Sequence, residues 1–109
     1  MRYVLFICTD PEGEPYDAAT DDPQAWWEPL QASGQYVIGD RLRPVEDATT
    51  VRVRAGERII TDGPFTESRE WIAGFDVVEA DDLDAAIEIA AGHPMARFGR
   101  IEVRPVWPL

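Results

Sequence analysis

The sequence that decides the fold is Arg2-Tyr3-Val4-Leu5-Phe6-Ile7-Cys8-Thr9, an almost unbroken run of β-branched, aromatic and aliphatic side chains. A run without polar alternation is typical of a strand that is covered on both faces. Residues 71–79 predict a second such strand, in which Gly74 marks a bulge or a close approach of another backbone. The fold must therefore cover both faces of at least these two strands.

A first helix is expected between them. Its start is Asp22, a good N-cap residue, with Pro23 in the first helical position, and its end is Gly34, which suits a left-handed residue after a helix. Pro29 predicts a kink or an early break, because proline has no N–H to donate to the carbonyl of Ala25.

A second helix shows the clearest periodicity in the chain. Asp81 or Asp82 caps it, and Gly92 ends it. Its apolar positions recur with the spacing of one helical face, at Leu83, Ala86, Ile87 and Ala90.

Further strands are expected at residues 35–42 and 100–106, with a hairpin whose arms are residues 49–54 and 57–61. Setting the hairpin aside leaves the order β-α-β-β-α-β. The expected fold class is therefore α+β, a ferredoxin-like protomer with an extra hairpin strand. Two helices cover only one face of such a sheet, so the other face requires a second copy of the chain, and we expect a homodimer.

Charge and composition exclude several functions. The 109 residues carry 21 acidic and 10 basic side chains, a net charge of −11, which excludes direct nucleic-acid binding because phosphate contacts need a basic surface. All the basic residues are arginines, so lysine-based chemistry such as a Schiff base is excluded. One cysteine excludes an internal disulfide, and one histidine excludes a multi-histidine metal site.

The chain also lacks a segment that could enter a membrane. Its longest strictly apolar run covers residues 3–8, far short of the roughly 20 residues that span a bilayer. Met1-Arg2 leads directly into a strand-like run without a signal-peptide cleavage site. We expect a single cytoplasmic domain over residues 1–109, with no metal, no cofactor and no membrane contact.

Residues 61–70, Thr61-Asp62-Gly63-Pro64-Phe65-Thr66-Glu67-Ser68-Arg69-Glu70, followed by Ile72-Ala73-Gly74-Phe75, resemble the signature of the YCII-related family. More narrowly, they resemble its DGPF-domain branch, named for the tetrapeptide at residues 62–65. Residues 2–7, 81–86 and 99–106 fit the family in the expected order, so the resemblance covers nearly the whole chain.

The resemblance implies a dimeric α+β barrel in which ferredoxin-like protomers pack their sheets face to face. Some YCII-related proteins are small-molecule enzymes, including a dehydrochlorinase, with a proposed His–Asp pair. Those relatives place the histidine on the first helix, where this chain has Gln24, Trp26, Trp27 and Glu28 instead. The His–Asp mechanism therefore cannot be transferred, and whether the chain is an enzyme stays open.

Three residues are candidates for catalysis. His93 is the only side chain whose ordinary pKa lies near neutrality, although it also suits a local role at the end of the second helix. Asp40, at the end of a strand, is the carboxylate that we pair with it. Asp62 either stabilises the turn at Asp62-Gly63-Pro64 or presents its carboxylate at the mouth of a pocket.

Four residues are candidates for ligand binding. Arg41 and Arg43 belong to a group of five arginines within residues 41–58, which either neutralise the protein's own carboxylates or bind a carboxylate or phosphate. Trp26 and Phe65 supply apolar walls for a pocket, or pack in the core or at an interface.

Two functions follow from these candidates. The first is a YCII-related DGPF-domain protein of unassigned activity that binds a small, anionic molecule in a dimeric α+β barrel. The alternative is a non-catalytic regulatory module that accompanies an extracytoplasmic-function sigma factor, because members of the DGPF branch are often encoded beside or fused to one. The net charge of −11 suits contact with a basic protein surface.

Overall fold

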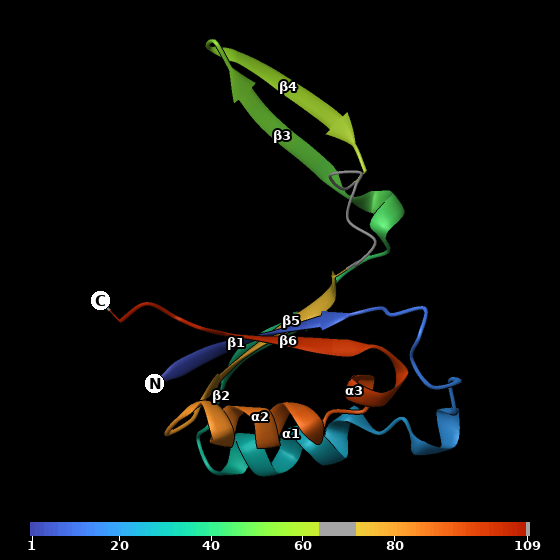
Figure 1. The fold of residues 1–109 in the computed structure, drawn as a ribbon, viewed down its shortest axis with the longest axis vertical. Coiled ribbons are helices and arrows are strands. Elements are labelled where there is room, and N and C mark those ends of the chain that lie inside the picture. The colour runs from blue at the N-terminus through green and yellow to red at the C-terminus, as the bar shows by residue number, and fades with distance from the viewer. Residues whose placement is uncertain (64–71, 109) are drawn as a thin grey trace.

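The computed structural model of the chain describes residues 1–63 and 72–108 and shows an α+β fold. Its centre is an antiparallel sheet with the strand order β2-β5-β1-β6 (Figure 1). The four strands are β1 (Arg2–Cys8), β2 (Tyr36–Arg41), β5 (Ile72–Glu79) and β6 (Arg100–Pro105). The two strands that are apolar on both faces, β1 and β5, are thus the two central strands of the sheet.

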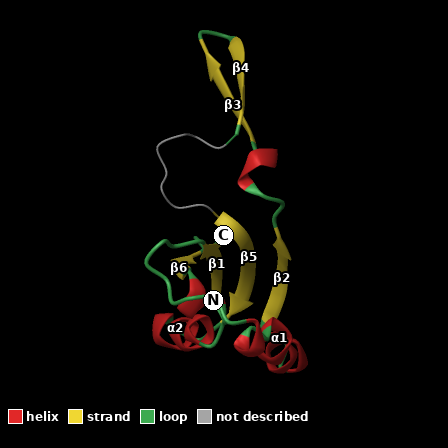
Figure 2. Cartoon of the chain, turned by 90° about the vertical axis from the view of Figure 1, so that its right-hand side faces the viewer, coloured by secondary structure: helices red, strands yellow, loops and turns green. Residues whose placement is uncertain are grey.

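Two helices, α1 (Pro23–Ala32) and α2 (Leu83–Ala91), lie on one face of this sheet (Figure 2). We call this face the inner face and the opposite one the open face. A short helix, α3 (Met95–Phe98), leads into β6, and single turns of 3₁₀-helix lie at Ala18–Thr20 and Val45–Asp47. The expectation that two helices cover one face of the sheet is confirmed.

The starts of both helices follow from their caps. The Asp22 carboxylate accepts a hydrogen bond from the N–H of Ala25 at 3.1 Å, and Asp82 accepts one from the N–H of Ala85 at 2.8 Å. Each carboxylate satisfies a backbone donor that has no partner within the first helical turn. Both predicted starts are confirmed.

The expected break at Pro29 is wrong, because α1 continues through it to Ala32. The N–H of Ser33 donates to the Pro29 carbonyl at 3.0 Å, so the helical pattern resumes after the proline. Pro29 and Ala25 are both exposed, so water can reach the Ala25 carbonyl that proline leaves without a helical donor.

The hairpin is formed by β3 (Thr49–Arg54) and β4 (Glu57–Asp62) and projects away from the main sheet (Figure 1). Its turn is Ala55-Gly56, where both residues have positive φ values, 50° and 79°. The expected hairpin is present, and within the described residues its arms pair only with each other, so it forms a separate two-stranded sheet beside the main one. The main sheet then has the β-α-β-β-α-β order with both arms set aside.

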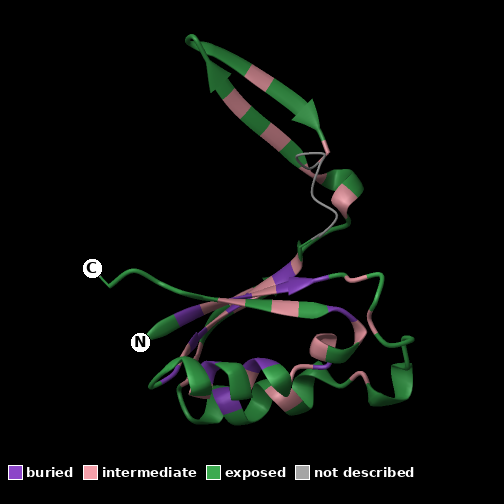
Figure 3. Ribbon diagram, viewed as in Figure 1, coloured by how far each residue is buried: buried purple, intermediate pink, exposed green. Residues whose placement is uncertain are grey.

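The core lies between the inner face and the helices (Figure 3). Leu5 and Val78 are completely buried there. Ala86 and Ala90, on one face of α2, are also buried, and their small side chains allow this helix to pack close to the sheet. The buried hydrophobic cluster comprises Tyr3, Leu5, Ile7, Val78, Ala80, Ala86 and Ala90.

The open face has an apolar centre. Residues that are paired across neighbouring strands point to the same face, so the register defines two rows on it. The rows are Asp40–Phe75–Phe6–Glu102 and Ile38–Val77–Val4–Arg104. The four residues on β1 and β5 are only partly buried in the single chain, and no helix of the described residues covers them.

Within the described residues, no helix is long and apolar enough to cross a membrane.

Replacing Leu5 by alanine should lower the free energy of unfolding by about 2–5 kcal/mol, because a fully buried leucine leaves a cavity between the sheet and α2. Ile87→Ala is the matched control, since Ile87 is 46% exposed and should cost less than about 1 kcal/mol. Urea denaturation followed by circular dichroism measures both values. Equal losses in the two variants would contradict the assignment of the core.

Candidate functional site

A cleft of about 400 Å³ lies on the helix side of the molecule, between the first turns of α1, strand β5 and the residue that follows the end of α2. Two tryptophans supply apolar surface, and one carboxylate and one imidazole supply the ionisable groups. The lining residues are Pro23, Gln24, Trp26, Trp27, Asp76 and His93.

Asp76 is the buried carboxylate of this cleft, with only 9% of the residue exposed. Its position in β5 places it on the inner face, between Gly74 and Val78. The hydroxyl of Tyr36 donates a hydrogen bond to Asp76 Oδ1 at 2.8 Å. This bond satisfies one carboxylate oxygen, which reduces the free-energy cost of burying the group.

Burial raises the pKa of the Asp76 carboxyl, and the charge of Asp40 raises it further. The hydrogen bond from Tyr36 and the charge of His93 act in the opposite direction without cancelling the effect of burial. Burial and the bond to Asp76 also raise the pKa of the Tyr36 phenol well above its usual value. Asp76 is therefore a stronger base than an exposed aspartate, and Tyr36 stays protonated.

Gly39 makes room for this pair of side chains. It lies opposite Asp76 in the register of β2 and β5. A Cβ atom at residue 39 would collide with Asp76 Oδ1 and the Tyr36 hydroxyl and would lie 2.6 Å from the Phe75 carbonyl oxygen. Any larger residue at this position would displace the hydrogen bond that holds the buried carboxylate.

His93 is held in one tautomer by the backbone. The N–H of Met95 donates to His93 Nδ1 at 3.0 Å, so the neutral ring carries its proton on Nε2. Burial lowers the pKa of His93, while the charges of Asp76 and Asp21 raise it in part. In its neutral form this imidazole is therefore a hydrogen-bond donor through Nε2.

The indoles of Trp26 and Trp27 line the cleft and contact the polar residues around it. Trp26 Nε1–H donates to the Ile89 carbonyl at 2.7 Å, which fastens α1 to the last turn of α2. The Trp26 ring meets the His93 ring edge-on at 4.7 Å between centroids. Trp27 meets the Tyr36 ring edge-on at 6.0 Å. The aromatic walls and the polar groups thus support one another.

Arg41 places a positive charge near Tyr16, on the inner-face side of β2. This placement follows from its pairing with Gly74 in the register of β2 and β5. The Tyr16 hydroxyl donates to Asp21 at 2.6 Å, and this bond raises the pKa of Tyr16 while the nearby charge of Arg41 lowers it. The charge of Asp21 also acts on His93 and raises its pKa.

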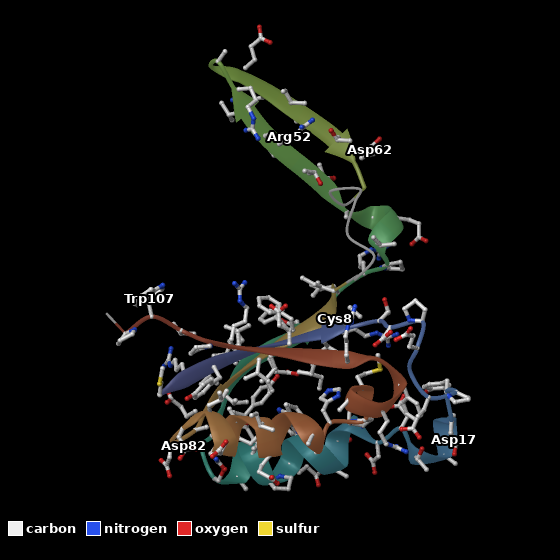
Figure 4. All side chains as sticks on the ribbon, in the orientation of Figure 1. Cys8, Asp17, Arg52, Asp62, Asp82 and Trp107 are labelled. Atoms are coloured by element: carbon white, nitrogen blue, oxygen red, sulfur yellow. The ribbon has the colours of Figure 1, made fainter. Side chains whose placement is uncertain are left out.

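The three predicted catalytic residues do not meet within one chain. His93 lines the cleft, but Asp40 is paired with Phe75 on the open face and reaches Asp76 only through its charge. Asp62 ends β4 and is exposed on the hairpin, on the far side of the sheet from the helices (Figure 4). The carboxylate that accompanies His93 in the cleft is Asp76.

The predicted ligand-binding residues also separate. Trp26 lines the cleft, whereas Arg41 is not among its lining residues and acts on Tyr16 through its charge. Arg43 pairs with Asp47 at 3.0 Å, and its side chain is 84% exposed. Phe65 lies outside the described residues. Of the predicted ligand-binding residues, Trp26 is thus the one that the structure places in the lining of the cleft.

Asp76 and Tyr36 were missed by the sequence analysis. Asp76 lies in a strand whose other residues indicate an apolar strand on both faces, so it was not selected as a candidate. Yet residues 74, 76 and 78 share one face by strand alternation, and a carboxylate between Gly74 and Val78 at a buried position is an available signal. Tyr36 lies 40 residues from Asp76 in sequence, so no local pattern links them.

No group of three His, Cys, Asp or Glu side chains that could hold a metal ion occurs in residues 1–63 and 72–108.

Two comparisons with known proteins bear on this site. The sequence profile of the YCII-related domain matches residues 1–109. An uncharacterized protein of Rhizobium meliloti (strain 1021) is 41% identical to the chain over 68 residues, which are 61% of this chain and 55% of that protein. The chain therefore spans about half the length of this curated relative.

Replacing Asp76 by asparagine should change how stability depends on pH. A carboxyl whose pKa is raised by folding contributes stability that is complete below the unfolded pKa, near 3.8, and is lost as the pH rises through the folded pKa. Asp76→Asn cannot ionise, so its free energy of unfolding should rise relative to that of the wild type as the pH rises above about 4.

Tyr36→Phe is the companion variant. Without the hydroxyl donor the ionised carboxylate is less well stabilised, so the loss of stability over the same pH range should be larger than in the wild type. Urea denaturation at several pH values measures all three proteins. A difference between Asp76→Asn and wild type that is constant with pH would show that burial does not perturb Asp76.

Proposed function

The chain belongs to the YCII-related domain family, and on that premise we propose that it binds and protonates or deprotonates a small anionic molecule in the cleft of Asp76 and His93. We also place it in the DGPF branch, because it carries the tetrapeptide Asp62-Gly63-Pro64-Phe65. The family match gives no reaction, so the function rests on the cleft.

The observation that carries this proposal is the presence of two differently tuned groups in one cleft. Asp76 is a buried base with a raised pKa, and His93 is a neutral donor with a lowered pKa. In this scheme the Asp76 carboxylate takes a proton from the bound molecule, and His93 Nε2–H donates a hydrogen bond to the oxygen on which negative charge develops. Groups tuned in opposite directions are typical of acid–base sites.

An exposed arginine on the helix-covered side of the sheet favours an anionic ligand. Arg41 is exposed on the inner-face side of β2, and a guanidinium binds carboxylate and phosphate groups in a bidentate manner. The indoles of Trp26 and Trp27 suit a flat apolar part of the same molecule. The proposed ligand class is therefore a small carboxylate or phosphate with an apolar or aromatic body.

The open face supports the proposal of a homodimer. Its apolar centre of Phe6, Phe75, Val4 and Val77 has no cover within the described chain. The face has apolar side chains in the middle, and its edges carry both acidic and basic residues, Asp40, Glu102 and Arg104, beside Ile38, so a second copy of the same face can complement it. We propose that two copies pack their sheets face to face and form a dimeric α+β barrel.

Arg41→Gln should weaken the binding of benzoate or phenyl phosphate about tenfold, since one charge-assisted hydrogen bond contributes about 1.5 kcal/mol. Titration of tryptophan fluorescence measures this affinity, because two of the indoles line the cleft. Arg43→Gln is the matched control and should stay within about twofold of the wild type, because Arg43 pairs with Asp47.

The same titration tests the role of Asp76. Asp76→Asn removes a negative charge from the cleft and should bind benzoate more tightly than the wild type near neutral pH. Equal losses of affinity in Arg41→Gln and Arg43→Gln would show that Arg41 does not belong to the binding site. A wild-type protein that shows no saturable response to either probe would overturn the proposal.

The homodimer is tested by Phe6→Glu, which places a charge at the centre of the open face. The wild type should sediment as a dimer at micromolar concentration, and the variant should sediment as a monomer, because an unpaired carboxylate at a buried interface is strongly unfavourable. Leu83→Glu, at an exposed position of α2, is the control and should leave the dimer intact. A wild-type monomer would contradict the proposal.

A further inference from the structure

The β3–β4 hairpin is an isolated two-stranded sheet with an apolar face. Cross-strand pairing joins Val51 to Ile60 and Val53 to Arg58, so these four side chains share one face. On that face Val51, Val53 and Ile60 are 61%, 57% and 63% exposed. The hairpin thus exposes three β-branched aliphatic side chains together.

The opposite face of the hairpin is better covered. Thr50, Arg52 and Ile59 alternate with the exposed residues and are all partly buried. Figure 3 shows this alternation along both arms. The uncovered apolar surface is therefore confined to one side, which is the side that a partner would occupy.

An isolated hairpin is at best marginally stable in water, and exposed β-branched side chains add to this cost. Stable two-stranded arms in proteins gain their stability from packing against another surface. Among the residues that the structure describes, the two arms pair only with each other. Packing onto a second molecule would supply the missing burial.

The charge of the hairpin distinguishes it from the rest of the chain. Residues 49–62 contain three arginines, Arg52, Arg54 and Arg58, and two carboxylates, a net charge of +1, whereas the whole chain carries −11. The hairpin is therefore the part of the surface that an acidic protein attracts, and a second copy of this chain is such a protein.

The direction of the hairpin identifies where that copy lies. Figures 1 and 2 show the helices on one side of the sheet and the hairpin extending from the other, so it rises on the side of the open face. A second copy that covers the open face of the sheet lies beside the hairpin. One partner thus meets both apolar surfaces.

We propose that the β3–β4 hairpin is a dimerisation arm, which packs Val51, Val53 and Ile60 against the second copy and sets Arg58, on the same face, among that copy's carboxylates. This inference rests on the proposed homodimer and adds a second contact to it. The arm extends the interface beyond the sheet. It explains why a hairpin that contributes no strand to the main sheet has an apolar side.

The test is the double variant Val51→Asp/Ile60→Asp, compared with Thr61→Asp. Thr61 is exposed on the opposite face of the same hairpin, so it controls for added charge and for the position in β4. Analytical ultracentrifugation should show the dissociation constant of the dimer raised at least about 100-fold in the double variant and changed less than about threefold in the control.

Amide hydrogen exchange of the wild-type protein provides a readout that does not depend on a variant. Amides of β3 and β4 should become more protected as protein concentration rises through the dimer dissociation constant, because packing on the partner closes the hairpin. Protection of these strands that is independent of concentration would contradict the proposal that the hairpin is a dimerisation arm. Equal dissociation constants for the double variant and the wild type would contradict it as well.

The outcomes separate this inference from the proposals on which it rests. If Phe6→Glu dissociates the dimer but Val51→Asp/Ile60→Asp does not, the interface through the sheet is supported and the hairpin contact is contradicted. A wild-type monomer would remove both interfaces. Benzoate binding by the double variant tests the cleft separately, because none of the substituted residues lines it.

Discussion

Two short helices can cover one face of a four-stranded sheet and no more, and the rest of the molecule depends on this constraint. The covered face holds the core and the cleft, and its small residues Ala86 and Ala90 bring α2 close to β1. The uncovered face keeps Phe6 and Phe75 only partly buried. In the homodimer that we propose, a central strand such as β1 would contribute to stability on one side and to association on the other, which would account for the absence of polar alternation in its sequence.

The cleft depends on a carboxylate that the covered face would otherwise exclude. Burying Asp76 without partners would be unfavourable by several kcal/mol, and the structure offsets this cost with the Tyr36 hydroxyl. Gly39 is required because the Tyr36–Asp76 hydrogen bond occupies the space that the Cβ atom of any other residue would need. Trp26 packs edge-on against the His93 ring and donates a hydrogen bond to the Ile89 carbonyl of α2. The residues that stabilise the fold here are the same ones that tune the two ionisable groups.

The sequence predicts those features that local chemistry determines. The caps at Asp22 and Asp82 and the turn at Ala55-Gly56 are each set by neighbouring residues, so they could be placed correctly. The partnership of Tyr36 and Asp76 could not, because it joins residues from different strands and depends on the register between β2 and β5. Pairing Asp40 with His93 failed for a related reason. One residue along a strand moves a side chain to the opposite face, and Asp40 follows Gly39.

That same alternation links the two faces of the sheet. Asp40 lies on the open face, yet its negative charge raises the pKa of Asp76 on the inner face. In a single chain Asp40 is exposed, so water screens much of this effect. A second copy on the open face would displace that water, and the field of Asp40 at Asp76 would strengthen. Dimerisation would then raise the pKa of Asp76 further, so that association through one face of the sheet makes the carboxylate on the other face a stronger base.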